Sequence, residues 1–124
     1  MKKFRSVLIT GASSGIGKAL AESLAGDGVC LAISGRDEAR LKAVADSCRK
    51  NGAIVDARII DVTDQTTMKN WLQEIDSLYP LDLVIANAGV SPGTSGKAEK
   101  TEQMRRMLDI NVNGVLNTID PVVP

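Results

Sequence analysis

The 124-residue sequence contains no histidine, only two cysteines, and one residue each of tryptophan, tyrosine and phenylalanine. Without histidine, a Ser-His-Asp triad or a zinc site with histidine ligands is excluded for this chain. Cys30 and Cys48 fall in apolar stretches and match no metal-binding spacing, so we expect small core residues rather than a disulfide. The scarcity of aromatic residues argues against recognition of single-stranded nucleic acid by base stacking.

An excess of one charge and a long apolar run are also missing. Fifteen basic and fifteen acidic side chains give a net charge of zero, which indicates neither nucleic acid nor a membrane surface as a partner. No stretch approaches the roughly 20 apolar residues of a membrane span. The apolar run behind the basic start ends at Thr10, too early for a signal peptide. We therefore expect one cytoplasmic domain over residues 1–124.

Apolar runs alternate with stretches of helical periodicity along the chain. Strands are expected over residues 5–10, 29–34, 53–60 and 82–86, and helices over residues 15–27, from Asp37 to Asn51, from Thr63 or Asp64 to Pro80, and over residues 98–119. Strands without polar alternation, separated by helices, predict an α/β fold whose parallel sheet is covered on both faces. Right-handed crossovers favour a doubly wound, Rossmann-type sheet of order 3-2-1-4, with a ligand beyond the first and fourth strands.

Two of the expected helices carry apolar stripes. In the first helix, Ile16, Leu20 and Leu24 lie at helical spacing. The stripe of the last helix comprises Met104, Leu108, Val112, Val115 and Ile119. Asn111 lies at helical spacing from this stripe, so its amide is expected to point inward and to need hydrogen-bond partners there.

The stretch from Thr10 to Gly17 joins a strand to a helix in the pattern T-G-x-x-x-G-x-G. Free backbone N–H groups and the positive end of the helix dipole favour an anion at such a helix start. We expect Gly11 to allow the sharp turn, Gly15 to let a diphosphate approach, and Gly17 to let the helix pack closely. Taken alone, the motif is equally compatible with a turn that binds nothing.

Arg36 follows the second strand, in Ser34-Gly35-Arg36-Asp37, where the adenosine ribose arrives in a dinucleotide-binding fold. A guanidinium can pair with a 2′-phosphate, whereas a carboxylate would bind a free 2′-hydroxyl. The sequence therefore favours NADP(H) over NAD(H), the alternative being a solvated arginine near a helix start. We assign Asp37 to capping of the following helix.

The glycine pattern resembles that of the short-chain dehydrogenase/reductase family, and further motifs of this family follow in the expected order. Asp61-Val62 resembles the pair that contacts adenine, and Asn87-Ala88-Gly89 resembles the N-A-G motif, which allows backbone contact with the cofactor. Thr10 ties the first strand to that loop in the family's pattern. Asn111 resembles the catalytic asparagine, which holds a water in a proton relay. For Asp61-Val62 and Asn87-Ala88-Gly89, the alternative is an ordinary turn at the end of a strand. For Asn111, the alternative is an asparagine inside a helix whose amide is hydrogen-bonded to the backbone.

The resemblance implies a homo-oligomeric enzyme that transfers hydride between a nicotinamide and a carbonyl or alcohol substrate. The implied cofactor-binding residues are Thr10, Gly11, Ser13, Ser14, Gly15, Ile16, Gly17, Ser34, Arg36, Asp61, Val62, Asn87, Ala88 and Gly89, with Asn111 as the catalytic residue and no metal ligand.

The catalytic serine and Tyr-x-x-x-Lys pair of that family have no counterpart in these residues. The one tyrosine, Tyr79, is followed four positions later by Leu83. We therefore expect an incomplete sheet and the cofactor-binding half of a longer enzyme, inactive by itself. A dinucleotide-binding module without catalysis is the alternative. A phosphoacceptor or flavin-type domain is disfavoured, because no acidic cluster ends the first strand.

Overall fold

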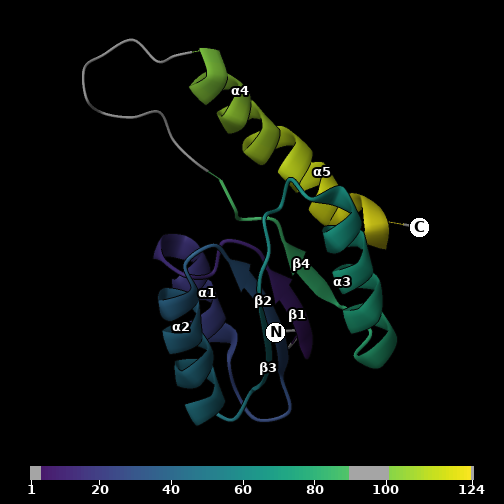
Figure 1. Cartoon of the computed structure of the whole chain (residues 1–124). Coiled ribbons are helices and arrows are strands. Elements are labelled where there is room, and N and C mark those ends of the chain that lie inside the picture. Colours follow the sequence, from purple (N-terminus) through teal and green to yellow (C-terminus); the bar gives the residue numbers. More distant parts are fainter. Residues whose placement is uncertain (1–3, 90–100, 124) are drawn as a thin grey trace.

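The computed structural model describes residues 4–89 and 101–123 (Figure 1). Within these ranges the strands form one parallel sheet in the order β3-β2-β1-β4. The strands are β1 (Ser6–Ile9), β2 (Cys30–Gly35), β3 (Ile54–Ile59) and β4 (Leu83–Ile85). In register, Ser6 of β1 lies opposite Cys30, and Val7 lies opposite Leu83. The predicted doubly wound α/β fold of order 3-2-1-4 is confirmed.

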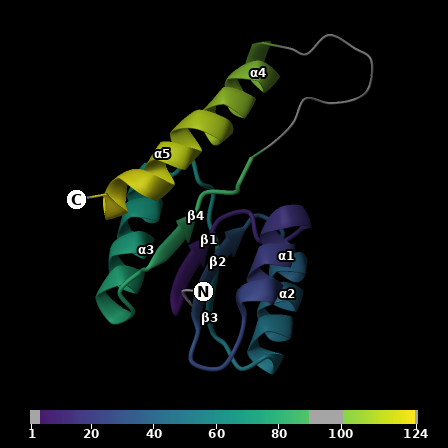
Figure 2. The ribbon, with the colours of Figure 1, turned by 180° about the vertical axis from the view of Figure 1, so that it is seen from behind.

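Helices cover both faces of this sheet. Their bounds are α1 (Gly15–Leu24), α2 (Glu38–Lys50), α3 (Gln65–Leu78), α4 (Thr101–Leu108) and α5 (Gly114–Ile119), with a π-helical turn over Asp109–Asn113 and a 3₁₀ turn over Asp120–Val122. Figures 1 and 2 show α1 and α2 on one face and α3 with α5 on the other, while α4 extends beyond the sheet. Among residues 4–89 and 101–123, no helix has the length and apolar character needed to cross a bilayer.

The strand β1 lies inside the sheet and is buried on both faces. Val7 and Ile9 belong to the apolar cluster under α1 and α2, whereas Leu8 belongs to the cluster under α3. A strand covered from both sides has no solvent face, which explains its unbroken apolar run. In contrast, Ile54 and Ile59 of β3 are 54% and 50% exposed, because β3 forms an edge of the described sheet.

Aspartates begin two of the helices, as their positions in the sequence predict. The Asp37 carboxylate accepts the N–H of Arg40 at the start of α2, and Asp64 accepts the N–H of Thr67 at the start of α3. Each bond satisfies one of the N–H groups that a helix start leaves free. Of the two predicted caps for α3, Thr63 and Asp64, the structure uses Asp64.

The cysteines are buried free thiols, Cys30 in β2 and Cys48 in α2. Burial raises the pKa of both thiols, and nearby carboxylates, Asp56 and Glu22 respectively, raise them further. Both side chains therefore stay protonated at neutral pH and serve as small apolar residues, as predicted.

The apolar stripe of α1 is only partly its buried face. Ile16 is 73% exposed, and Leu20 and Leu24 are only partly buried against the core. Gly17 and Ala21 occupy the buried positions instead. Small residues let α1 lie close to the rest of the molecule, but they contribute little to an apolar pattern. The stripe of large side chains therefore indicates the helix, and Leu20 and Leu24 of this stripe pack against the core, whereas Ile16 does not.

The last predicted helix, over residues 98–119, is helical throughout residues 101–119 but contains a π-helical turn. Residues 98–100 lie outside the described ranges, and the remainder consists of α4, the π-helical turn and α5. A π-helical turn inserts an extra residue into a helix and so rotates the faces on its two sides relative to one another. A single stripe extrapolated through the turn cannot face the core along its whole length.

Accordingly, the predicted stripe of this helix is not its buried face. Its members are exposed or half-buried: Met104, Leu108, Val112, Val115 and Ile119. The buried positions are Ile110, Gly114 and Thr118. A Cβ on Gly114 would lie 2.5 Å from a methyl group of Val62, so only glycine permits this approach to the segment after β3. Close packing of small residues, rather than large apolar ones, decides how α5 is placed.

Candidate functional site

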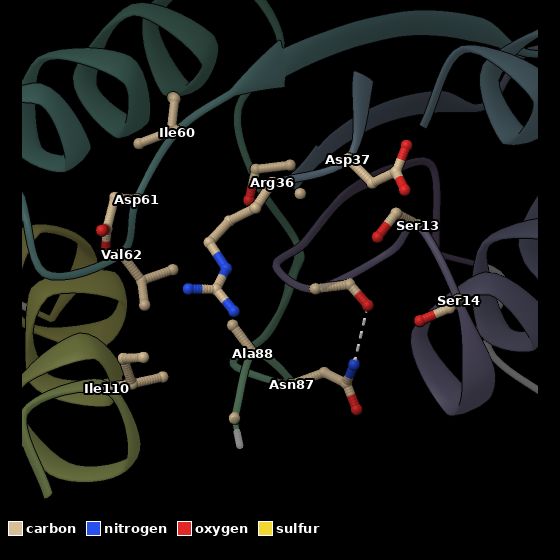
Figure 3. A pocket seen from close by; sticks show the side chains of 14 residues that line it. Ser13, Ser14, Arg36, Asp37, Ile60, Asp61, Val62, Asn87, Ala88 and Ile110 are labelled. Atoms are coloured by element: carbon tan, nitrogen blue, oxygen red, sulfur yellow. Dashed lines mark hydrogen bonds between the residues drawn. The ribbon is translucent and has the colours of Figure 1, made fainter. Parts of the chain in front are cut away.

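A cavity of about 330 Å³ opens at the carboxyl ends of the four described strands (Figure 3). Ten of the predicted site residues line it: Gly11, Ser13, Ser14, Ser34, Arg36, Asp61, Val62, Asn87, Ala88 and Gly89. These residues come from four separate loops, so the fold alone brings them together. A cavity where the winding of a doubly wound sheet reverses is the expected place for a ligand.

Five predicted residues do not line this cavity: Thr10, Gly15, Ile16, Gly17 and Asn111. Sequence reasoning also missed four lining residues, namely Gly35, Asp37, Ile60 and Ile110. Ile60 and Ile110 supply an apolar wall and are nearly buried. A single buried isoleucine carries no signal in a sequence, because core positions hold the same residue type. In the part of the chain that the structure describes, no group of three or more potential ligand side chains is placed to hold a metal ion.

The glycine-rich turn between β1 and α1 has the geometry that its glycines require. Gly11 has a φ of 67° and Gly15 a φ of 58°, in the left-handed region where side chains are strained. No atom lies within 4 Å of where a Cβ on Gly15 would be, so the backbone there is open. A Cβ on Gly17 would meet the Gly11 carbonyl oxygen at 2.2 Å. Gly17 thus sets how closely α1 approaches the turn itself.

The start of α1 keeps its N–H groups available. Ser14 occupies the N-cap position, but its side chain makes no capping hydrogen bond. Ser14 lines the cavity, so the helix start, with its free N–H groups and the positive end of the helix dipole, lies at the cavity edge beside the open backbone at Gly15. This arrangement can bind a diphosphate without a charged side chain.

Thr10 lies behind the cavity and joins its two sides. The Thr10 hydroxyl accepts hydrogen bonds from the backbone N–H groups of Asn87 and Ala88, each at 3.1 Å. In return, the Asn87 side-chain amide donates to the Gly11 carbonyl oxygen at 3.1 Å (Figure 3). These bonds hold the glycine-rich turn and the end of β4 in one fixed arrangement.

Arg36 extends its side chain into the cavity (Figure 3). Across residues 4–89 and 101–123, no carboxylate forms an ion pair with its guanidinium, although six other pairs are present. A Cβ on the neighbouring Gly35 would lie 3.0 Å from Ser13, so an acidic side chain there would be crowded. The end of β2 therefore offers a free cation at the cavity.

Ser34 places an unpaired hydroxyl in the wall of the same cavity. It is fully buried, and its Oγ has no hydrogen-bond partner among the described residues. A buried polar atom without a partner is costly, so it needs an explanation. A polar ligand in the cavity would supply the missing partner.

Asp61, at the end of β3, is held by three hydrogen bonds. Its Oδ1 accepts from the N–H and the hydroxyl of Thr63, at 3.0 and 2.7 Å, and its Oδ2 accepts from Nη2 of Arg106 at 2.7 Å. The hydrogen bond from Arg106 is the largest influence on the Asp61 carboxyl, and together with the Thr63 bonds it lowers the pKa to about 2 despite partial burial. Arg106 was not predicted, because it lies 45 residues further along the chain and only the placement of α4 brings it here.

Asn111 lies in the π-helical turn and is exposed, so the expected burial of its amide is not found. Its Oδ1 lies 3.1 Å from where a Cβ on Gly89 would be, which places the amide beside the end of β4. Asn111 is thus next to the cavity without lining it.

The family model for short chain dehydrogenases matches residues 5–124. This chain belongs to the short-chain dehydrogenase family. The family is one of oxidoreductases that use nicotinamide cofactors and small-molecule substrates. An uncharacterized oxidoreductase of Myxococcus xanthus is 38% identical over 122 residues, covering 98% of this chain and 48% of the relative. The chain spans about half the length of the curated relatives it matches.

Solved structures of two dehydrogenases share this fold, one with NAD⁺ bound and one with an NADP derivative. An NAD⁺-bound xylitol dehydrogenase superposes with a TM-score of 0.86 at 26% identity, covering 98% of this chain and 48% of the other. An alcohol dehydrogenase from the archaeon Thermococcus sibiricus, complexed with 5-hydroxy-NADP, superposes with a TM-score of 0.82 at 30% identity, covering 94% of this chain and 51% of the other. Because these two structures hold different nicotinamide cofactors, the likeness does not choose between NAD and NADP.

Tyr79 lies at the opposite end of the sheet from the cavity. It follows α3, and its carbonyl oxygen accepts from the Ser6 hydroxyl at 2.7 Å, where β1 begins. A tyrosine at the amino ends of the strands cannot reach a ligand bound at the carboxyl ends. In this member of the short-chain dehydrogenase family, Tyr79 is therefore not a counterpart of the catalytic tyrosine.

Proposed function

We propose that this chain binds NADP(H) and forms the cofactor-binding half of an oxidoreductase that transfers hydride between the nicotinamide and a carbonyl or alcohol substrate. The observation that supports this most directly is the cavity itself. It joins the glycine-rich turn, Arg36, Asp61 and the N-A-G loop in one space. Together, these four groups could contact a dinucleotide along its length, from the adenine to the nicotinamide.

The residues at this cavity fit such a cofactor. Gly15 leaves the backbone open for the diphosphate, Arg36 offers an unpaired guanidinium, and Ser34 has a buried hydroxyl without a partner. When bound, the cofactor supplies the nicotinamide ring that donates or accepts hydride.

Each part of the chain then has a distinct task at the cavity. The N–H groups at the start of α1 bind the diphosphate, and the Arg36 guanidinium pairs with a 2′-phosphate. The Asp61 carboxylate accepts from the amino group of the adenine. The backbone of the N-A-G loop, residues 87–89, contacts the nicotinamide-side ribose, and the amide of Asn111 holds a water for proton transfer.

The preference for NADP(H) rests on Arg36 and is tested by titrating the chain with NADPH and NADH, following the nicotinamide fluorescence. We expect tighter binding of NADPH, and Arg36→Ala should weaken NADPH binding by about 10- to 100-fold, as loss of a charge-assisted pair predicts. Binding of NADH should change little. Equal weakening of both dinucleotides would contradict the assignment.

A matched control for this experiment is Lys42→Ala in α2. Lys42 is an exposed cation that pairs with Asp46 on the helix surface and does not line the cavity. Its removal changes the net charge by the same amount as Arg36→Ala. Unchanged NADPH affinity in this variant would show that the loss in Arg36→Ala is local.

A second candidate function is dinucleotide binding without catalysis, and the position of Tyr79 favours it. The described residues place their one tyrosine away from the cavity, so they hold no proton donor of that type. The two candidates differ in what the full gene product does with NADPH and a set of aldehydes and ketones. Oxidation of NADPH would support the enzyme, and tight binding without turnover would support the module.

A further inference from the structure

The Asp61 carboxylate connects the cavity to a residue outside it, Arg106 of α4. Nη2 of Arg106 donates to Asp61 Oδ2 at 2.7 Å, and Nη1 lies 3.5 Å from the Thr63 hydroxyl. Asp61 lines the cavity, whereas Arg106 and Thr63 do not. The guanidinium therefore does not contact a ligand in the cavity directly, but it contacts a carboxylate that can.

The three hydrogen bonds fix the orientation of the carboxylate and leave part of it open. Oδ1 carries two of them, both from Thr63, and Oδ2 carries the one from Arg106. An ionised carboxylate accepts about four hydrogen bonds in all. The Asp61 side chain is also 39% exposed. One acceptor position on Oδ2 thus stays available to a donor in the cavity.

We propose that Arg106 is a positioning residue for recognition of the adenine ring. By binding Oδ2, it holds the carboxylate plane so that the open acceptor position meets an amino group on the ring. This inference rests on the proposed function, because it takes Asp61 as the group that meets the adenine. Thr63 alone holds only Oδ1, so without Arg106 the plane can rotate about the terminal torsion of the side chain.

A purely structural role would leave a different signature. The Arg106 and Asp61 side chains are 44% and 39% exposed, and exposed pairs of this kind contribute little to stability. Loss of Arg106 should therefore leave the fold intact. Loss of Arg106 should instead reduce the preference for an adenine ring over a ring without the amino group, while leaving overall dinucleotide binding largely unchanged.

The test compares NADPH with its hypoxanthine analogue, in which an oxygen replaces the amino group of the ring. We expect the wild-type chain to prefer NADPH by about tenfold, as a hydrogen bond to a charged acceptor predicts. Arg106→Met should lower this ratio to about twofold, and Arg106→Lys should restore part of it. Arg105→Met is the matched control, because Arg105 precedes Arg106 in α4 and makes none of the six ion pairs.

Asp61→Asn provides a second variant that separates positioning from other effects. It should lower the same ratio, and adding Arg106→Met to it should change the ratio no further, because the two residues act through one contact. Circular dichroism and urea unfolding establish that each variant is folded.

The outcomes distinguish failure of the inference from failure of the proposed function. If Arg106→Met weakens both dinucleotides equally, or leaves the ratio unchanged, Arg106 does not position Asp61 and the inference is wrong while cofactor binding stands. A wild-type chain that binds both rings alike would overturn the adenine contact and the inference together. A chain that binds neither would overturn the proposed function and this inference with it.

Discussion

The Thr10 hydroxyl accepts the backbone N–H of Asn87 at 3.1 Å, and this contact joins the glycine-rich turn to the end of β4. Thr10 is 1% exposed, so its side chain is shielded from bulk water. The same oxygen also accepts the N–H of Ala88. A single buried side chain therefore satisfies two loop N–H groups and keeps the two walls of the cavity together.

Replacement of Thr10 by valine should destabilise the chain, because valine has the same shape but cannot accept either hydrogen bond. The Ala88 N–H would lose its acceptor, whereas the Asn87 N–H would keep the Ile85 carbonyl oxygen at 3.1 Å, which predicts a loss of about 1–2 kcal/mol in the free energy of unfolding. Urea denaturation measures this. Thr66→Val, at an exposed position of α3, is the control and should change stability by less than about 0.5 kcal/mol. Equal stability of Thr10→Val and wild type would show that the contact does not hold the loops.

Replacement of Gly17 by alanine should damage the cofactor site. The added Cβ would lie 2.2 Å from the Gly11 carbonyl oxygen and 2.6 Å from the Asn87 amide nitrogen, so the turn must shift. We expect a loss of about 1–3 kcal/mol in stability and a clear loss of NADPH affinity. Gly26→Ala is the control, since no atom lies within 4 Å of its added Cβ. Normal NADPH binding by Gly17→Ala would contradict the close approach seen here.

The Asp61 carboxyl should make stability depend on pH at the acidic end of the range. Its pKa is lowered from 3.8 to about 2 in the folded chain, chiefly by Arg106. A depressed folded pKa contributes stability that is present above pH 3.8 and is lost as the pH falls from there toward 2. Because the Asp61–Arg106 pair is partly exposed, we expect it to contribute only about 0.5–1 kcal/mol to the free energy of unfolding.

Urea unfolding of wild type and Arg106→Met at pH 7, 4 and 2.5 checks this expectation. The difference in free energy of unfolding between wild type and Arg106→Met should be largest at pH 7, still present at pH 4, and much smaller at pH 2.5. Arg105→Met should follow wild type at every pH. A difference that grows as the pH falls would have the opposite sign and would contradict the role of Arg106 at Asp61.

The strand and helix pattern of the fold could be predicted from local signals. The unbroken apolar runs of β1 and β2 indicate strands covered on both faces, and Asp37 and Asp64 mark helix starts by short-range hydrogen bonds. The glycine-rich turn carries its own signal as well, because left-handed backbone at Gly11 and Gly15 requires glycine. Such features depend on neighbours in the chain and so are visible in the sequence.

The sequence by itself therefore determined the doubly wound fold and most of the residues that line the cavity. Only the tertiary structure decided which faces of the helices are buried: small residues such as Gly17 and Gly114 pack inward while Ile16 and Leu108 stay exposed. It also decided that Arg106 meets Asp61, 45 residues away. The physical reason is that local periodicity and capping act between near neighbours, whereas close packing and long-range ion pairs depend on distances that the folded chain alone sets.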